Sequence, residues 1–277
     1  MIRPALLLIL LASLWPAAPE QAPAPQLSAD EIARRVQDRN TGRDGRSAMR
    51  MRLFDRQGRA RERALTMISL RGRGTPGAAP NAPEGDRLLI RFTLPADIRG
   101  TSFLVREHPG ADDERFLFLP SLGRVRRIAG SETQESFVGS DFTYEDIGGR
   151  EFDEYTYALA EENATWTPAS GGGARPAWRL ESRRKDASAE FPRVVSTVLK
   201  DSFLVVGADI YNRRNEKQKT YTVRRIEQIQ SIWTVMESEM ANALERTRTE
   251  LVVESSAYNV GLTDGDFSRR ELERGAK

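Results

Sequence analysis

The sequence contains no cysteine and only one histidine, His108, among its 277 residues. Without cysteine, the chain can form no disulfide bond and can carry no lipid on a cysteine after an export signal. Zinc sites built on histidine and cysteine ligands are excluded for the same reason. A Ser–His–acid triad would depend on His108 alone, and no Gly-x-Ser-x-Gly motif is present. We therefore expect His108, which precedes Pro109 in a charged stretch, to be an exposed turn residue.

Signals for phosphate, nucleic acid and calcium binding are also missing. The triple glycine Gly171–Gly173 lacks the lysine and the following helix of a phosphate-binding loop, so it predicts a flexible hairpin turn. The formal net charge is only +2, and basic residues are interspersed with acidic ones, which argues against a nucleic-acid partner. No Asp-x-Asp-x-Asp-Gly spacing marks a calcium loop. The sequence thus predicts neither a metal site nor a cofactor.

The first residues have the pattern of a cleaved export signal. Arg3 is followed by the apolar run Leu6–Leu11 and then by Pro16 and small residues. This run is far shorter than the roughly 20 apolar residues that a spanning helix needs. We expect residues 1–24 to hold the signal peptide and the start of a disordered Pro/Ala tail. Residues 25–277 are then predicted to form a single domain in the periplasm.

One helix is predicted at the start of this domain, and strands follow it. Ser28 and Glu31 form a capping box before the apolar positions Ile32 and Val36. After Gly45, apolar and polar residues mostly alternate with period two, and turn signals recur about every 8–12 residues, which is typical of antiparallel strands. The predicted strands are 49–53, 64–70, 88–94, 101–106, 115–119, 155–160, 178–183, 194–199, 204–211, 221–229, 232–240 and 247–258.

The predicted fold class is mainly β, with some α. A strongly curved antiparallel sheet should form an incomplete, half β-barrel, with the N-terminal helix over its concave side, and such a concavity can hold a ligand. Residues 237–248 could instead form a helix, because Met240 and Leu244 are four residues apart, but we favour strands there. A short amphipathic helix with Phe267 and Leu272 should close the chain.

Apolar residues on these strands either form ordinary core or line a cavity, and the sequence leaves both open. Methionine slightly favours a cavity, because its flexible thioether adapts to varied apolar ligands. The candidate lining residues are Met49, Met51, Leu88, Ile90, Phe92, Phe103, Phe116 and Phe118.

A polar stretch follows the strand at 116–119. It contains a basic turn with Arg124, Arg126 and Arg127, and then an aromatic and acidic loop. Two carboxylates in that loop could divide acid and base roles if their environments separated their pKa values. We prefer the alternative that Asp141, Glu145 and Asp146 cap the loop and pair with the three arginines. The candidate partner-binding residues are Arg124, Arg126, Arg127, Asp141 and Tyr144.

Four segments, taken in this order, resemble the bacterial outer-membrane lipoprotein-sorting family, the LolA-like periplasmic carriers. The segments are SADEIARRVQDR at 28–39, FLPSLGRVRRI and GSDFTYEDI within 116–146, the stretch YNRRNEKQKTYTVRRIEQIQSIWTVMESEM at 211–240, and YNVGLTDGDFSRRELER at 258–274. The resemblance implies a LolA-like half-barrel with helices over its open face. It also implies a carrier of lipids or lipoprotein acyl chains and a companion of RND-type exporters, and it supplies no catalytic residues.

Three functional hypotheses remain. The first is a monomeric, non-enzymatic periplasmic carrier that moves acyl chains toward the outer membrane. The second is a non-transporting envelope sensor or adaptor that uses the same fold and contacts a partner protein through Arg124–Arg127. The third, ranked last, is an exported hydrolase that uses Asp141 and Asp146.

Overall fold

The computed structural model describes residues 26–74 and 78–274; the predicted signal peptide and most of the Pro/Ala tail lie outside them. Helices in this part are α1 (Ala29–Asp38), α2 (Tyr144–Gly148) and α3 (Arg269–Glu273), with the short 3-10 helices η1 (Pro120–Leu122), η2 (Gly130–Glu132), η3 (Phe137–Gly139), η4 (Phe152–Glu154) and η5 (Asp264–Phe267). Strands are β1 (Asp44–Phe54), β2 (Ala60–Leu70), β3 (Arg87–Leu94), β4 (Ser102–Arg106), β5 (Glu114–Leu119), β6 (Arg124–Arg127), β7 (Tyr155–Trp166), β8 (Arg175–Arg184), β9 (Arg193–Leu199), β10 (Val205–Tyr211), β11 (Lys217–Ile229), β12 (Ile232–Asn242) and β13 (Thr247–Tyr258). None of the helices in the described residues is long and apolar enough to span a membrane.

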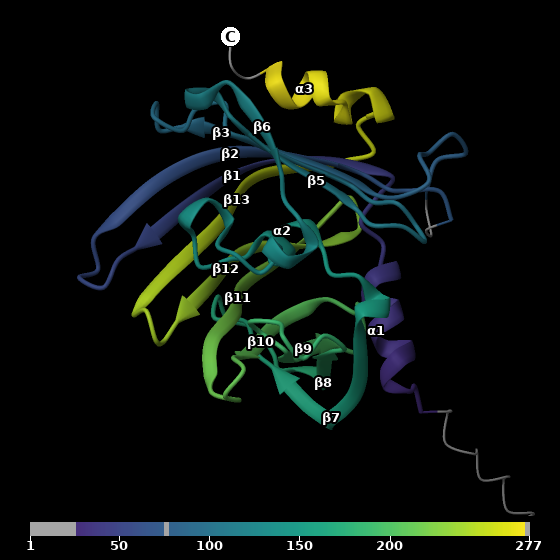
Figure 1. Cartoon of the computed structure of the whole chain (residues 1–277). Coiled ribbons are helices and arrows are strands. Elements are labelled where there is room, and N and C mark those ends of the chain that lie inside the picture. Colours follow the sequence, from purple (N-terminus) through teal and green to yellow (C-terminus); the bar gives the residue numbers. More distant parts are fainter. Residues whose placement is uncertain (1–25, 75–77, 275–277) are drawn as a thin grey trace, which may run out of the picture.

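All thirteen strands form one open antiparallel sheet, in the order β6-β5-β4-β3-β2-β1-β13-β12-β11-β10-β9-β8-β7. The sheet curves strongly around a concave side and does not close into a barrel (Figure 1). The predicted curved half-barrel is confirmed. The two edge strands, β6 and β7, are consecutive in the chain.

Alternation along the strands decides which side chains face the concavity. In β1, Met51 and Leu53 are buried, whereas Arg50 and Arg52, which alternate with them, are exposed on the other face. Arg50 there pairs with Glu254 of β13 at 2.6 Å. Such an exposed pair adds little stability, so the packed inner face carries most of the energy of this region.

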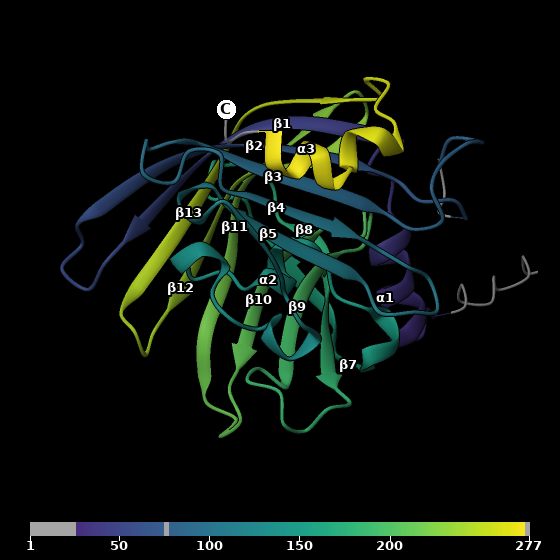
Figure 2. The ribbon, with the colours of Figure 1, turned by 45° about the horizontal axis from the view of Figure 1, so that its top comes forward.

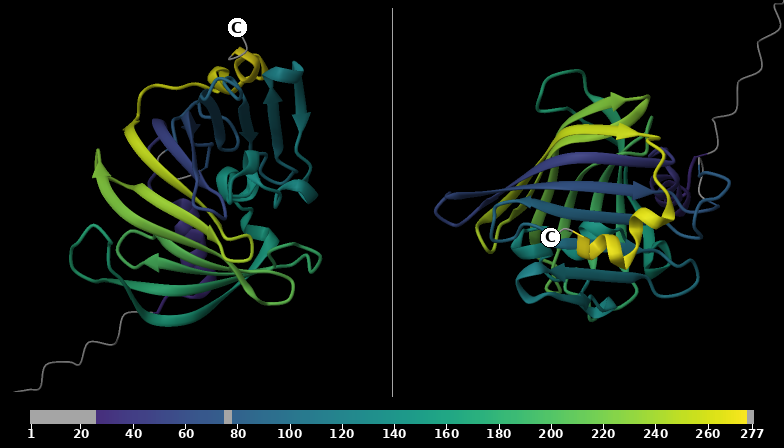
Figure 3. Two further views of the ribbon diagram at one scale, coloured as in Figure 1. Left: turned by 90° about the vertical axis from the view of Figure 1, so that its left-hand side faces the viewer. Right: turned by 90° about the horizontal axis from the view of Figure 1, so that it is seen from above.

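The chain between the two edges, residues 128–154, runs through the concave side; we call it the crossing segment. It contains η2, η3, α2 and η4, which lie inside the cup of the sheet (Figure 3). This course follows from the topology, because the segment must join one edge of a strongly curved sheet to the other.

Helix α1 also lies on the concave side, over β7 and β8. Its predicted capping box is present: Ser28 Oγ accepts from the Glu31 backbone nitrogen at 3.2 Å, and the Glu31 carboxylate accepts from the Ser28 nitrogen at 2.8 Å. Ile32 is fully buried and packs in one cluster with Trp178 and Leu180. The predicted N-terminal helical cover is therefore confirmed.

The C-terminal residues cover the opposite, convex face. Figure 2 shows α3 lying across β3 and β4 from outside. Phe267 belongs to η5 and Leu272 to α3, so two short helices stand in place of the single one predicted. Both side chains are fully buried against Leu104, Phe116 and Phe118.

One local alternative and one local prediction were wrong. Residues 237–248 are not helical, because β12 alternates buried and half-buried side chains along its whole length and continues through a turn into β13. The basic residues Arg124–Arg127 form β6 rather than a turn, because they pair with the end of β5.

Candidate functional site

The crossing segment packs its aromatic residues onto the apolar concave face of β1–β5. Phe137 and Tyr144 lie in one cluster with Met51, Phe92 and Phe103. The ring of Phe137 is 5.5 Å from that of Phe103 and 5.9 Å from that of Phe92, centre to centre. The interior that a ligand would need is thus filled by a connection that contains no strand.

Six of the eight candidate lining residues come together on this face. Met51, Ile90, Phe92 and Phe103 are buried in the inner cluster, and Met49 and Leu88 pack against it, half-buried. Phe116 and Phe118 do not join them, because they point to the convex face and pack under Phe267 and Leu272. In β5 it is Leu117, between them, that faces the concavity.

Asp141 fastens the crossing segment to the sheet. Its carboxylate accepts hydrogen bonds from the hydroxyls of Thr247 and of Thr249, the latter at 2.7 Å. Its backbone nitrogen donates to Thr249 Oγ1 at 3.0 Å, and its carbonyl accepts from Lys219 Nζ at 2.9 Å. Burial lowers the pKa of Lys219, so this amino group is held where its charge is disfavoured.

Glu145 fastens the same segment to the β7–β8 edge. It is 5% exposed, accepts from Arg184 Nη1 at 2.8 Å and is hydrogen-bonded by the Tyr155 hydroxyl. Burial and the neighbouring Glu145 raise the pKa of Tyr155, so the phenol stays a donor. The carboxylate is therefore satisfied by two donors from the far edge of the sheet.

The predicted pairing of the loop carboxylates with Arg124, Arg126 and Arg127 was wrong. Glu145 pairs with Arg184, and Asp146 pairs with Arg150 at 2.8 Å. Burial would raise the pKa of Asp146, but Arg150 and the Thr143 backbone hold it below its usual value. Asp141 and Asp146, the residues of the hydrolase hypothesis, are thus occupied by different structural partners.

The candidate partner-binding residues separate into two groups. Arg124, Arg126 and Arg127 lie exposed on the edge strand β6, and Arg126 pairs with Glu132. Asp141 and Tyr144 are only 8% and 5% exposed inside the cup. A partner could touch those two only after the crossing segment had left the sheet.

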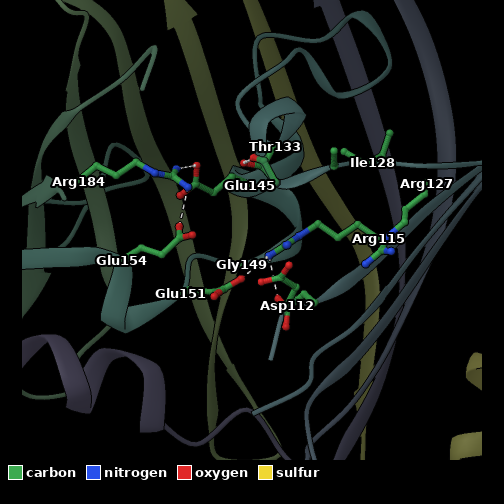
Figure 4. Close-up of a pocket in the computed structure, with 13 residues that line it drawn as sticks. Asp112, Arg115, Arg127, Ile128, Thr133, Glu145, Gly149, Glu151, Glu154 and Arg184 are labelled. Atoms are coloured by element: carbon green, nitrogen blue, oxygen red, sulfur yellow. Dashed lines mark hydrogen bonds and ion pairs between the residues drawn. The ribbon is translucent and has the colours of Figure 1, made fainter. Parts of the chain in front are cut away.

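A polar pocket of about 350 Å³ lies where the two edges of the sheet approach each other. Arg115 and Arg127 come from β5 and β6, Arg184 comes from the end of β8, and the crossing segment contributes Glu145 and Glu151 (Figure 4). Arg115 donates to Asp113 at 2.8 Å and lies 3.5 Å from Glu151, while Arg184 binds Glu154 at 2.6 Å.

A second hollow of about 280 Å³ lies beside Asp141 and Lys219 and reaches Leu53 and Thr247. No group of three or more His, Cys, Asp or Glu side chains within the described ranges is arranged to hold a metal ion.

Sequence reasoning missed the residues that hold the crossing segment: Lys219, Thr249 and Arg184. One signal was available. In β11 and β13, Lys219 and Thr249 stand at positions that alternate in phase with Tyr221 and Leu251, which face inward. A polar side chain at an inward position needs a partner, since an unpaired buried polar group is costly.

Comparisons with known proteins agree with this architecture. No curated protein sequence matches the chain. A sequence model of a family described as "Uncharacterized protein" matches residues 84–274. Among solved structures, a domain described as an outer membrane lipoprotein-sorting protein from Vibrio parahaemolyticus is 27% identical, with a TM-score of 0.77 over 88% of this chain and 98% of that one.

Two further structures extend the comparison. A DUF1329 family protein from Desulfovibrio piger is 29% identical, with a TM-score of 0.75 over 88% of this chain and 97% of that one. A LolA superfamily protein from Nitrosomonas europaea shares the fold, with a TM-score of 0.65 over 89% of this chain and all of that one, at 16% identity. The chain therefore belongs to the family of the matching sequence model; it has a LolA-like fold, and it is similar to a solved domain described as an outer membrane lipoprotein-sorting protein.

Proposed function

We propose that this protein is a periplasmic carrier that binds acyl chains of lipids or lipoproteins between the concave face of the sheet and the crossing segment. Its task is to move them toward the outer membrane. The observation that carries the proposal is the apolar concave face of β1–β5, covered only by one connection that two polar anchors hold in place. Binding and release, without bond-making, are the activity that such a surface offers.

Neither hollow of the closed form suits an acyl chain, because charged side chains line both. A bound acyl chain must therefore take the place of the side chains of Phe137, Phe142 and Tyr144, which are each at most 5% exposed. Removing three such side chains from the interior costs about 5–9 kcal/mol, at about 1.5–3 kcal/mol each. An acyl chain of about 16 carbons gains about 13 kcal/mol when it leaves water, which exceeds the cost of displacing these three side chains.

A disulfide that locks the crossing segment tests this proposal. The Asp141 nitrogen lies 3.0 Å from Thr249 Oγ1, which brings the two residues close enough for a cysteine pair. The chain has no cysteine of its own, so the pair D141C/T249C can bridge only to itself. We expect the reduced variant to bind a fluorescent fatty acid, and the oxidised variant to bind it at least about tenfold more weakly, a loss of about 1.4 kcal/mol.

The matched control is the pair S47C/S256C, which joins β1 to β13 away from the crossing segment, where the native hydroxyls are 3.0 Å apart. Oxidation of this pair should leave fatty-acid binding unchanged. Equal binding by the oxidised and reduced forms of D141C/T249C, or no binding by either form, would contradict the proposal.

We further propose that an RND-type exporter exchanges cargo with the protein through the exposed basic edge strand β6. An edge strand offers unpaired backbone groups, and here Arg124 and Arg126 add positive charge. Reversing both charges (Arg124→Glu, Arg126→Glu) should abolish capture by exporter domains in a pull-down while fatty-acid binding persists. If the exporter domains captured this variant as well as the original protein, β6 would not be the docking site.

A further inference from the structure

The pocket between the two sheet edges has the features of a built binding site. Three of its polar residues are almost fully buried: Arg115, Thr133 and Glu145 are 6%, 4% and 5% exposed. Each is held by hydrogen bonds to other groups: Arg115 to Asp113, Thr133 to the Gly130 carbonyl, and Glu145 to Arg184. Its volume of about 350 Å³ lies within the range of small-ligand sites.

Negative charge is in excess around this pocket. Five carboxylates and three guanidinium groups line it. Arg115 and Arg184 each serve two of the carboxylates, so their charges are already shared. Burial, Asp113 and Glu154 together raise the pKa of Glu151, which shows that the carboxylates crowd one another. A cation placed beside Glu151 and Glu154 would relieve this repulsion.

An anion-binding group lies in the same pocket. Among the described residues, Arg127 pairs with β5 through its backbone, but its exposed guanidinium, the third of the lining, makes no ion pair or hydrogen bond. The Nε of Arg115 is buried without a hydrogen-bond partner. One ligand that carries a positive and a negative group would therefore satisfy both sides of the pocket.

The pocket also borders the apolar interior. Ile128 lines the pocket and is a buried member of the inner cluster with Phe103 and Tyr144. Thr133 and Glu145 belong to the crossing segment, so the same segment forms a wall of the pocket and the cover of the apolar face. A molecule with its polar head in the pocket could extend its chains beneath that cover.

We propose that this pocket binds an aminoalkyl phosphate group, the headgroup of a zwitterionic phospholipid of the phosphatidylethanolamine type. The protonated amine donates hydrogen bonds to Glu151 and Glu154, and the phosphate pairs with Arg127. That this group belongs to a lipid rests on the proposed carrier function. The assignment adds the headgroup class of the cargo.

The test uses the chain from residue 25 onward and three probes: dioctanoyl phosphatidylethanolamine, dioctanoyl phosphatidylglycerol and free O-phosphoethanolamine. Titration calorimetry should show the ethanolamine lipid binding about tenfold more tightly than the glycerol lipid, because only its amine forms charge-assisted hydrogen bonds with carboxylates. The free headgroup reports whether the pocket accepts this group without acyl chains.

Variants separate the two halves of the headgroup. Glu151→Gln should remove most of the preference for ethanolamine, whereas Arg127→Gln should weaken both lipids alike, because both carry a phosphate. The matched controls are Glu161→Gln on β7 and Arg270→Gln on α3, which remove exposed charges outside the pocket and should leave affinity and preference unchanged.

Equal affinity for the two lipids, or a preference that survives Glu151→Gln, would overturn the assignment while leaving acyl binding intact. Binding of free O-phosphoethanolamine that depends on Glu151 and Arg127, without binding of either lipid, would support the pocket and overturn the carrier proposal instead.

Discussion

Strands β2–β5 have two apolar faces, and a short piece of chain covers each of them. On the convex face, Leu104 and Phe118 lie beneath Phe267 and Leu272, which are fully buried. On the concave face, Phe103 and its neighbours lie beneath the crossing segment. The same strands therefore carry two comparable apolar contacts, which differ in what holds the cover in place.

The convex cover is held by apolar packing together with the pair Arg87–Asp264 at 2.9 Å and a hydrogen bond from Arg91 to the Glu271 carbonyl. The concave cover is held by Asp141 and Glu145, both buried charges. Arg87 on the convex side is buried as well, but the concave cover depends on two buried charges and the convex cover on one. Because a buried charge costs desolvation that its pairing must offset, we expect the concave cover to open at lower cost. Under the proposed carrier function, the difference means that the convex cover stays shut and the concave cover is exchanged for a ligand.

The largest expected effect is the contrast between Phe267→Ala and Phe137→Ala. Both remove a fully buried phenyl ring, and such changes typically cost about 3–5 kcal/mol. We expect Phe267→Ala to lower the free energy of unfolding by about this amount, because we expect the convex cover to open only when the whole chain unfolds. The loss for Phe137→Ala should be smaller, because it cannot exceed the free energy that closes the crossing segment. Urea unfolding measures both losses.

Hydrogen exchange supplies the second measurement for this pair. In Phe137→Ala the amides of residues 137–147 should exchange faster while those of β3 and β4 keep their protection. In Phe267→Ala all of these amides should lose protection together. If both variants lost the same stability and showed the same pattern of hydrogen exchange, the two covers would behave alike and the proposed difference between them would be contradicted.

Most of the sheet could be predicted from the sequence because strand alternation is local. The runs at 88–94, 194–199 and 247–258 match β3, β9 and β13 closely. The phase of alternation was harder to assign. In β5 the sequence reads Phe116, Leu117, Phe118. Two aromatic residues made the wrong face look like the lining, because the sequence did not show which face the C-terminal helices cover.

The anchors of the candidate site could not be predicted in the same way. Asp141 binds Thr247, which is 106 residues away, and Lys219, which is 78 residues away. The nearby Arg124–Arg127 offered opposite charge at short sequence distance, but β6 holds these side chains on an exposed edge. Pairing across the cup depends on the curvature of the whole sheet, which no local pattern records.

A smaller effect concerns pH, which should act at the charged end of the concave side and not under the convex cover. Burial and the carboxylates of Asp86 and Asp113 raise the pKa of Glu107 from 4.5 to about 7. Between these values the folded chain keeps a proton that the unfolded chain has lost, so stability from this group falls as pH rises from 4.5 to about 7. Glu107→Gln should flatten this fall and raise the free energy of unfolding at pH 8 by about 1–3 kcal/mol. Urea midpoints from pH 5 to pH 8 measure this pH dependence, and Glu84→Gln, at an exposed position, is the matched control. If Glu107→Gln left the pH dependence of stability unchanged, Glu107 would ionise freely in the fold and the repulsion at this end would be weak.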